Sequence, residues 1–375
     1  MKTKIILLFV LILLIPETAL AYSEWPFSAM LSGAIHETGK GVRIALVDTG
    51  ISAENLDSDL IEPGKNYVFP GKTTQDLIGH GTAVAGIILG SEVLGLEGLA
   101  ENAALIPLVC YTLDDKGEPV IAEADVIVQA IRDAIDDFDA DIITVSTGLT
   151  KNNCGFKDAV AYAEANGVVI VSGVGNDGRT NPKTLWYPAA YETVIGAAAI
   201  GKTGRISDFS QKNFTAALSA PGEKIKVVPV ERKGYITNED GTSFSAAFIS
   251  AGVALLIEKY PQSNPETIRE MLYESALDIE EVGFDDASGW GVMQIDKALA
   301  TELEKIEDDS TQEKKSEPPT DEAEQINMTK ENEKTRIPIG GMIAIAVACL
   351  AAVVGLGWAL IKAVDSQMKK RINKR

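Results

Sequence analysis

Short apolar runs that favour β-strands alternate with longer helix-like segments through most of the chain, and this alternation restricts the possible folds more than any other feature. The runs are apolar enough to be buried on both faces, and strands that alternate with helices form right-handed βαβ units. The sequence therefore predicts an α/β fold with a doubly wound, mainly parallel sheet and helices on both faces. The expected strands are Val42–Val47, Ala104–Val109, Ile142–Val145 and Val168–Val171, and the expected helices are Gly81–Leu89, Ala122–Ile135, Phe156–Ala165 and Ser243–Lys259.

The first residues have the composition of a secretory signal peptide. Lys2 and Lys4 precede an apolar run, Ile5–Pro16, which is followed by the small-residue site Ala19–Ala21. The apolar run is shorter than the about 20 residues that span a bilayer. We predict a signal peptide over residues 1–21 that is cleaved after Ala21, with an uncleaved anchor as the alternative.

A second apolar segment, Ile337–Ile361, runs without a charged residue and is long enough to cross a bilayer. The residues after it are basic and those before it are acidic. The positive-inside rule then places the tail 362–375 in the cytoplasm and everything before the segment outside the cell membrane. We predict one C-terminal transmembrane helix, and a buried core helix is the alternative.

The remaining chain divides by composition. Residues 301–336 are rich in Glu, Lys, Ser and Pro, cannot bury enough apolar surface to fold, and are predicted to form an acidic disordered linker. Residues 22–40 form a short N-terminal extension, too short for a core of its own. The globular domain is expected over residues 41–300, with the extension packed against it.

Net charge and cysteine content exclude some functions. A formal charge of −20 argues against nucleic-acid binding, because nothing would neutralise phosphates. Cys110 and Cys154 lie in the globular part, where they could form a disulfide in an exported chain or stay free. No CxxC motif or Cys/His cluster indicates a zinc site.

Three short motifs carry residues suited to chemistry. Val47–Gly50 ends an expected strand, and Gly79–Thr82 and Gly241–Ser243 each open an expected helix. Each motif alone is weak, since Asp-Thr-Gly also occurs in aspartic proteases and a serine can simply cap a helix. Together they supply an acid, a base and a nucleophile in the order Asp48, His80, Ser243, at the sheet edge where α/β domains bind ligands.

This combination resembles the subtilisin-like serine proteases, or subtilases. Further segments match the family: Ser146–Gly148, Val168–Asn176, Ala220–Gly222 and Gly289–Met293. The resemblance implies a subtilisin-like fold for nearly the whole domain. Ala247-Phe248 departs from the Pro-His pair that usually follows the nucleophile, which puts the local helix packing in doubt rather than the chemistry.

The resemblance assigns the catalytic roles. Ser243 would attack the scissile carbonyl, His80 would take and return the proton, and Asp48 would orient the imidazole. The Asn176 side chain and the Ser243 backbone N–H would hold the oxyanion. The other histidine of the chain, His36, precedes the first strand and is expected to face solvent or end a helix.

The resemblance also marks substrate-binding positions: Ser146, Gly148, Gly175 and Trp186. Trp186 falls near the base of the family's primary specificity pocket, where it would shorten the pocket, although a core tryptophan is an equal alternative. Asp57 and Glu92 fall near positions where many relatives bind calcium. A surface carboxylate usually binds no metal, so no metal or other cofactor is predicted. A structural calcium ion stays possible.

The complete architecture is similar to that of the mycosins, the anchored subtilases of type VII secretion systems. We therefore predict a membrane-anchored extracellular serine endopeptidase that processes secreted or surface proteins. Its expected partners are polypeptide substrates, the membrane and components of a secretion system. The alternative is a non-catalytic scaffold with a protease fold in such an assembly. A lipase or esterase is disfavoured because the G-x-S-x-G elbow and the Ser-Asp-His order are absent.

Overall fold

The computed structural model describes residues 24–230 and 236–301. All of them belong to the first of two units of the chain, Met1–Glu307. The predicted signal peptide, the transmembrane helix, the basic tail and nearly all of the linker lie outside the described residues.

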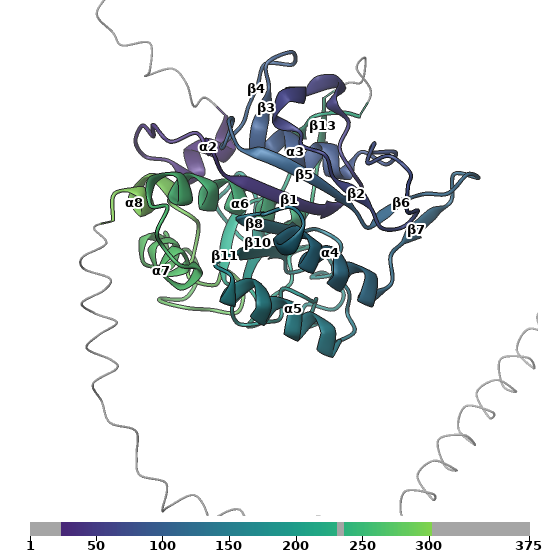
Figure 1. The fold of residues 1–375 in the computed structure, drawn as a ribbon. Coiled ribbons are helices and arrows are strands. Elements are labelled where there is room, and N and C mark those ends of the chain that lie inside the picture. Colours follow the sequence, from purple (N-terminus) through teal and green to yellow (C-terminus); the bar gives the residue numbers. More distant parts are fainter. Residues whose placement is uncertain (1–23, 231–235, 302–375) are drawn as a thin grey trace, which may run out of the picture. The chain divides into compact units, whose positions relative to one another are not determined.

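A seven-stranded sheet forms the centre of the domain, and each pair of neighbouring strands in it is parallel (Figure 1). The strand order is β11-β10-β9-β8-β1-β5-β2. Strands β2 and β5 lie on one side of β1, and the later strands β8 to β11 lie on the other. The strand order therefore reverses beside β1, and doubly wound folds bind their ligands at such a point. The strands are β1 (Arg43–Asp48), β2 (Lys65–Asn66), β5 (Ala104–Val109), β8 (Ile142–Val145), β9 (Val169–Gly173), β10 (Ile195–Ile200) and β11 (Leu218–Pro221).

Alternate residues of β1 enter two different apolar cores. In β1, Ile44 and Leu46 join one core, and Ala45 and Val47 join the other. This is the period of two that a strand imposes on its side chains. Both cores are apolar, which explains why the strands read as continuous apolar runs.

Helices cover both faces of the sheet (Figure 1). Residues of α3 (His80–Leu89) and α6 (Thr242–Lys259) lie in one core, and residues of α4 (Ala124–Asp136) and α5 (Cys154–Ala165) lie in the other. The remaining helices are α2 (Trp25–Met30), α7 (Pro265–Ser275) and α8 (Ile295–Leu299), with short 3₁₀ turns η2 (Ala53–Asn55) and η3 (Ser58–Leu60). The predicted α/β fold is confirmed, and so are the type and approximate bounds of the expected strands and helices.

Helix α6 passes through the middle of the first core. Among the described residues it is the one helix long and apolar enough to cross a membrane, but 83% of its apolar window is buried inside the domain. All residues from Thr242 to Leu256 are buried, so nearly every face of the helix contacts protein. A helix that is apolar all round is typical of such a central position.

Three antiparallel pairs surround the main sheet. They are β3 (Gly90–Ser91) with β4 (Leu96–Glu97), β6 (Tyr111–Leu113) with β7 (Pro119–Ile121), and β12 (Ile225–Val227) with β13 (Thr237–Glu239). The β6–β7 hairpin directly follows β5 and therefore begins at the carboxyl end of the sheet. This position makes it a wall of the site described below.

The N-terminal segment packs into the domain. Met30 of α2 is fully buried, and the Phe27 ring meets the Phe248 ring of α6 edge to face at 6.2 Å between centroids. The Glu258 carboxylate at the other end of α6 accepts hydrogen bonds from the backbone N–H groups of residues 38, 39 and 40, at 2.6, 2.6 and 3.2 Å. Apolar burial and these charge-assisted hydrogen bonds together hold the segment against α6.

Both cysteines of the described part are free thiols, so the disulfide that the sequence left open does not form. Cys110 is buried after β5, and burial raises the pKa of its thiol to about 12. Such a thiol is an inert apolar filler. Cys154 is exposed at the start of α5.

Candidate active site

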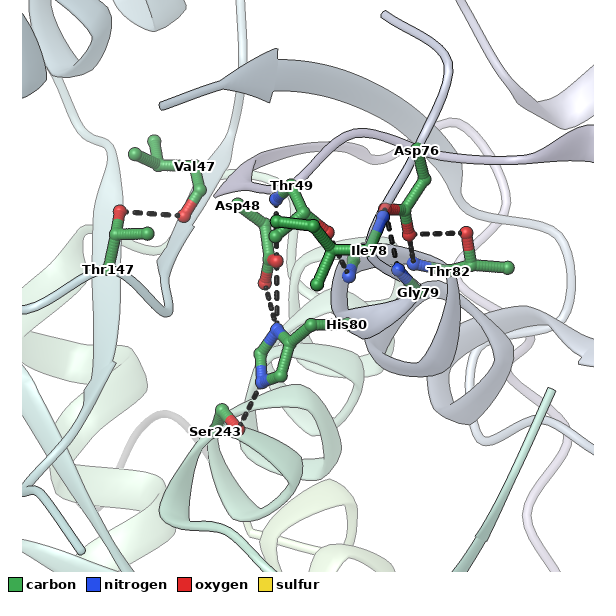
Figure 2. A network of polar contacts seen from close by, with 11 residues as sticks. Val47, Asp48, Thr49, Asp76, Ile78, Gly79, His80, Thr82, Thr147 and Ser243 are labelled. Atoms are coloured by element: carbon green, nitrogen blue, oxygen red, sulfur yellow. Dashed lines mark hydrogen bonds and ion pairs between the residues drawn. The ribbon is translucent and has the colours of Figure 1, made fainter. Parts of the chain in front are cut away.

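Three side chains from separate elements form one hydrogen-bonded chain at the carboxyl edge of the sheet (Figure 2). Asp48 is the last residue of β1, His80 the first of α3 and Ser243 the second of α6. His80 Nδ1 lies 2.8 and 3.0 Å from the two Asp48 carboxylate oxygens, and His80 Nε2 lies 2.8 Å from Ser243 Oγ. These are the contacts by which a carboxylate orients an imidazole and the imidazole activates a hydroxyl.

The local backbone explains how α3 can approach β1 so closely. The Gly81 N–H donates to Thr49 Oγ1 at 2.8 Å, just past the end of β1. A Cβ on Gly81 would lie 2.1 Å from the Gly50 carbonyl oxygen, which no side chain permits. The glycine after His80 is therefore required to bring the imidazole within reach of Asp48.

A fourth polar residue, Asp76, supports the histidine from the loop before α3 (Figure 2). Its carboxylate is buried and accepts from the backbone N–H groups of Ile78, Gly79 and Thr82, at 2.9, 2.8 and 2.9 Å, and from Thr82 Oγ1 at 2.7 Å. A carboxylate beside the first turn of a helix satisfies its free N–H groups and favours its dipole. Asp76 therefore fixes the turn that carries His80.

The charged groups of the triad shift one another's pKa values. Burial by itself would raise the pKa of Asp48, but the charge and hydrogen bond of His80, with contributions from Ser146 and the Thr49 N–H, hold it below its ordinary value. Burial by itself would lower the pKa of His80, but the Asp48 carboxylate outweighs this and raises it, and the charges of Asp76 and Glu239 act in the same direction. The aspartate stays ionised, and the imidazole is a stronger base than a free one.

This shift predicts the acid limit of any activity that uses His80 as a base. A charged imidazole cannot accept the Ser243 proton, and a raised pKa keeps it charged to higher pH. We expect kcat/KM to fall with decreasing pH through a midpoint above 6.5, the ordinary value for histidine. Glu239→Gln removes one negative charge and should move the midpoint downward.

A pH profile of kcat/KM for the wild type and this variant checks the prediction. Glu274→Gln is the matched control, because Glu274 is an exposed residue of α7 that does not act on His80. It should leave the midpoint unchanged. An acid limb centred below 6.5, or no acid limb at all, would contradict the role of His80 as the base.

Asn176 follows β9 and contacts the start of α6. The Thr242 backbone N–H donates to Asn176 Oδ1 at 2.9 Å. Since a backbone N–H can only donate, the amide oxygen must face it, which leaves the Asn176 NH₂ group free for the pocket. The first backbone N–H groups of α6, that of Ser243 among them, have no acceptor within their own helix. Two donors therefore lie beside the nucleophile where an oxyanion would form.

These residues share one pocket of about 270 Å³. All the positions that the sequence assigned to substrate binding line it together with His80, Ser243 and Asn176: Ser146, Gly148, Gly175 and Trp186. Trp186 is half-buried and is one of the residues that line the pocket.

Sequence reasoning missed several residues around the pocket. Tyr111 and Ile121 of the β6–β7 hairpin line it, and their apolar, strand-like context gave no signal. Phe244 stacks on the imidazole of His80, with 5.6 Å between ring centroids and 25° between the planes. Asp76 was missed as well, although an acid three residues before a Gly-His turn is typical of helix starts. His36 lies outside the pocket, in the N-terminal segment.

No group of three or more His, Cys, Asp or Glu side chains that could hold a metal occurs among the described residues. Asp57 and Glu92 line one other pocket, where the Asp57 carboxylate accepts the Asp59 backbone N–H. Calcium takes six to eight oxygen ligands, often from several carboxylates. Glu97 and Glu101 line the same pocket, and no step of the mechanism passes through a metal.

Comparison with known proteins agrees with this geometry. The model of the subtilase family matches residues 39–291. The minor extracellular protease Epr of Bacillus subtilis is 31% identical over 293 residues, which cover 76% of this chain and 43% of the relative. The chain spans less than half the length of the first curated relatives that it matches.

Solved structures show the same likeness. The structure of fervidolysin from Fervidobacterium pennivorans, described as a keratinolytic enzyme related to subtilisin, superposes with a TM-score of 0.64 at 28% identity and covers 74% of this chain and 46% of that one. MycP1 from the ESX-1 type VII secretion system superposes with a TM-score of 0.61 at 25% identity, over 71% of this chain and 82% of that one.

Proposed function

Because the chain belongs to the subtilase family, we propose that it is a serine endopeptidase that cleaves polypeptides through an acyl-enzyme on Ser243. The observation that carries the proposal is the unbroken chain of contacts from Asp48 through His80 to the Ser243 hydroxyl. It stands beside two donors suited to an oxyanion, from Asn176 and the Ser243 backbone. A bare serine hydroxyl is too weak a nucleophile, and this arrangement supplies what it lacks.

The reaction follows from the geometry. Ser243 Oγ attacks the scissile carbonyl carbon while His80 Nε2 takes its proton, and Asp48 stabilises the imidazolium. The carbonyl oxygen becomes an oxyanion between the Asn176 amide and the Ser243 N–H. His80 then gives its proton to the leaving amine, the C–N bond breaks, and an acyl ester remains on Ser243. Water, activated by the same imidazole, attacks this ester and releases the acid.

Cleavage within a chain is supported by the depressions that adjoin the catalytic pocket. A second depression shares Ile121 with the catalytic pocket, and a third shares His80 with it on the side of Phe244 and Val230. The catalytic pocket therefore adjoins two further depressions, which offer room for substrate residues besides the one at the scissile bond. An exopeptidase would need one end closed.

We further propose that the enzyme is anchored in the cell membrane with its catalytic domain outside. The sequence supports this through the signal-like residues 1–21, the apolar segment 337–361 and the basic residues after it. The likeness to MycP1 from a type VII secretion system supports a place beside a membrane secretion assembly. Secreted or surface proteins would then be the substrates.

Labelling with a fluorophosphonate probe on intact cells tests activity and location together. The wild-type protein should be labelled and the Ser243→Ala variant should not. A protease added outside should release the labelled domain by cutting within 301–336. Labelling only after lysis would contradict the orientation, and no labelling even after lysis would contradict the enzyme. Secretion that is unchanged by Ser243→Ala but lost on deletion of the gene would favour a scaffold.

A further inference from the structure

The indole of Trp186 occupies the gap between two chain segments beside the nucleophile. One segment follows β8 and contains Gly148; the other follows β9 and contains Gly175. A Cβ on Gly148 would lie 3.3 Å from Trp186 Cε3, and a Cβ on Gly175 would lie 2.3 Å from Trp186 Cδ1 and 2.4 Å from Nε1. The ring therefore packs directly on both glycines.

The backbone holds this tryptophan in place. The next residue, Tyr187, exchanges two hydrogen bonds with Leu149, at 3.0 and 2.8 Å, and the Trp186 carbonyl accepts the Ala190 N–H at 2.9 Å. The indole Nε1 is buried and has no hydrogen-bond partner among the described residues. A donor buried in this way normally costs free energy, and the ring keeps its place beside both glycines despite that cost.

The same gap must receive part of the substrate. His80 has to protonate the leaving amine, so the amine side of the scissile bond lies toward the imidazole. Asn176 holds the carbonyl oxygen, and the residue next to Asn176 is Gly175. The side chain that precedes the scissile bond therefore points away from His80, toward Gly148, Gly175 and the ring between them.

We infer that Trp186 closes this subsite, so that the enzyme cleaves after small side chains such as those of Gly, Ala and Ser and rejects aromatic ones. The inference rests on the peptidase function proposed above and names its substrate class. Specificity of this kind follows from pocket shape, since a filled pocket excludes a large side chain by overlap. The indole nitrogen has no hydrogen-bond partner in the described part of the chain, which agrees with this role, because the tryptophan then contributes volume and no hydrogen bond.

The test uses the full chain and tetrapeptide p-nitroanilides that differ only in the residue before the bond cleaved. The wild type should show kcat/KM that declines along the series Ala, Val, Leu and Phe, with Phe at least about tenfold below Ala. Trp186→Gly empties the gap and should raise kcat/KM for Phe by roughly 10- to 100-fold, the gain expected when a buried phenyl ring finds an apolar slot. Trp186→Phe is the matched control: it keeps a ring there and should keep the preference for Ala.

Equal cleavage after Ala and Phe by the wild type would overturn the inference without any variant. A preference that Trp186→Gly leaves unchanged would overturn it as well.

A second measurement separates the subsite from catalysis. In the Ser243→Ala background, calorimetry follows the binding of N-acetyl tetrapeptides ending in Ala or Phe. Trp186→Gly should strengthen binding of the Phe peptide about tenfold. If no p-nitroanilide is cleaved but this gain appears, the proposed function fails and the subsite stands; absence of the gain overturns the subsite.

Discussion

Replacing Ser243 with alanine should lower kcat by about 10⁶-fold, and adding His80→Ala to it should lower kcat no further. Losses of this size and this lack of additivity are those measured for the triad of a subtilisin. The physical reason is that Ser243 and His80 act as one unit, joined by the 2.8 Å contact between Oγ and Nε2. Asp48→Asn should cost less, roughly 10⁴-fold, because the nucleophile and base remain and only the imidazole tautomer is lost.

Two matched controls separate chemistry from folding. Ser245 lies on the same buried helix and donates to the carbonyls of Ala220 and Pro221, at 3.0 and 3.2 Å. Ser245→Ala should lower the thermal unfolding temperature without changing the chemistry, whereas Ser243→Ala should do the reverse. His36→Ala should leave kcat unchanged. If a folded Ser243→Ala or His80→Ala protein kept more than a trace of wild-type kcat, the assigned triad would be wrong.

Removing the side chain of Asn176 should lower kcat by about 10²- to 10³-fold with little change in KM. This is the loss recorded when one oxyanion donor is removed from a subtilisin. The substrate carbonyl gains a full negative charge only in the transition state, so a donor aimed at it acts on kcat. Steady-state kinetics on a folded Asn176→Ala protein gives both constants.

Asn176 also accepts the Thr242 N–H, and a second variant separates this contact from catalysis. Asn176→Asp keeps an oxygen for Thr242 but places a negative charge where the NH₂ group was. It should lose at least as much kcat as Asn176→Ala while keeping more of the wild-type unfolding temperature. Unchanged kcat in either protein would place the oxyanion donors elsewhere, and a loss confined to KM would make Asn176 a ground-state contact.

The central part of the fold was predictable because its strands are buried on both faces. The expected ranges Ala104–Val109 and Ile142–Val145 are those of β5 and β8. Three further strands of the sheet, β2, β10 and β11, were missed. Strand β10 reads Ile-Gly-Ala-Ala-Ala-Ile, and alanine and glycine are poor indicators of a strand even where the sheet buries them. Only the packing of α6 against this strand explains why small residues suit it.

Helix α7 was also missed, although the local signals for it exist. Asn264 caps it by accepting the Thr267 N–H at 2.8 Å, and Pro265 occupies the first turn. Ile268 and Leu272 supply the buried stripe, but the many polar residues between them make the segment look like a surface loop. Cap and proline together should have outweighed that polar composition.

Some residues of the site could likewise be predicted from the sequence, and others could not. Asp48, His80 and Ser243 stand in short motifs that the sequence displays directly. The environment of Trp186 does not, because the glycines it contacts come from two other segments that only the folded sheet brings together. The role of Asp76 depends on burial of its carboxylate, which no local pattern reveals.

The ring stacked on His80 also determines how the site responds to oxidants. Thioethers and thiols are the side chains that peroxides attack most readily, and a sulfur atom next to a nucleophilic serine would let a single oxygen atom crowd it. Here the residue after Ser243 is Phe244, and no sulfur-bearing side chain lines the catalytic pocket in the part of the chain that the structure describes. Met30, Met271 and Met293 are enclosed in the cores, so Cys154 on α5 is the sulfur left exposed there. Oxidative damage to the described domain therefore begins away from its chemistry.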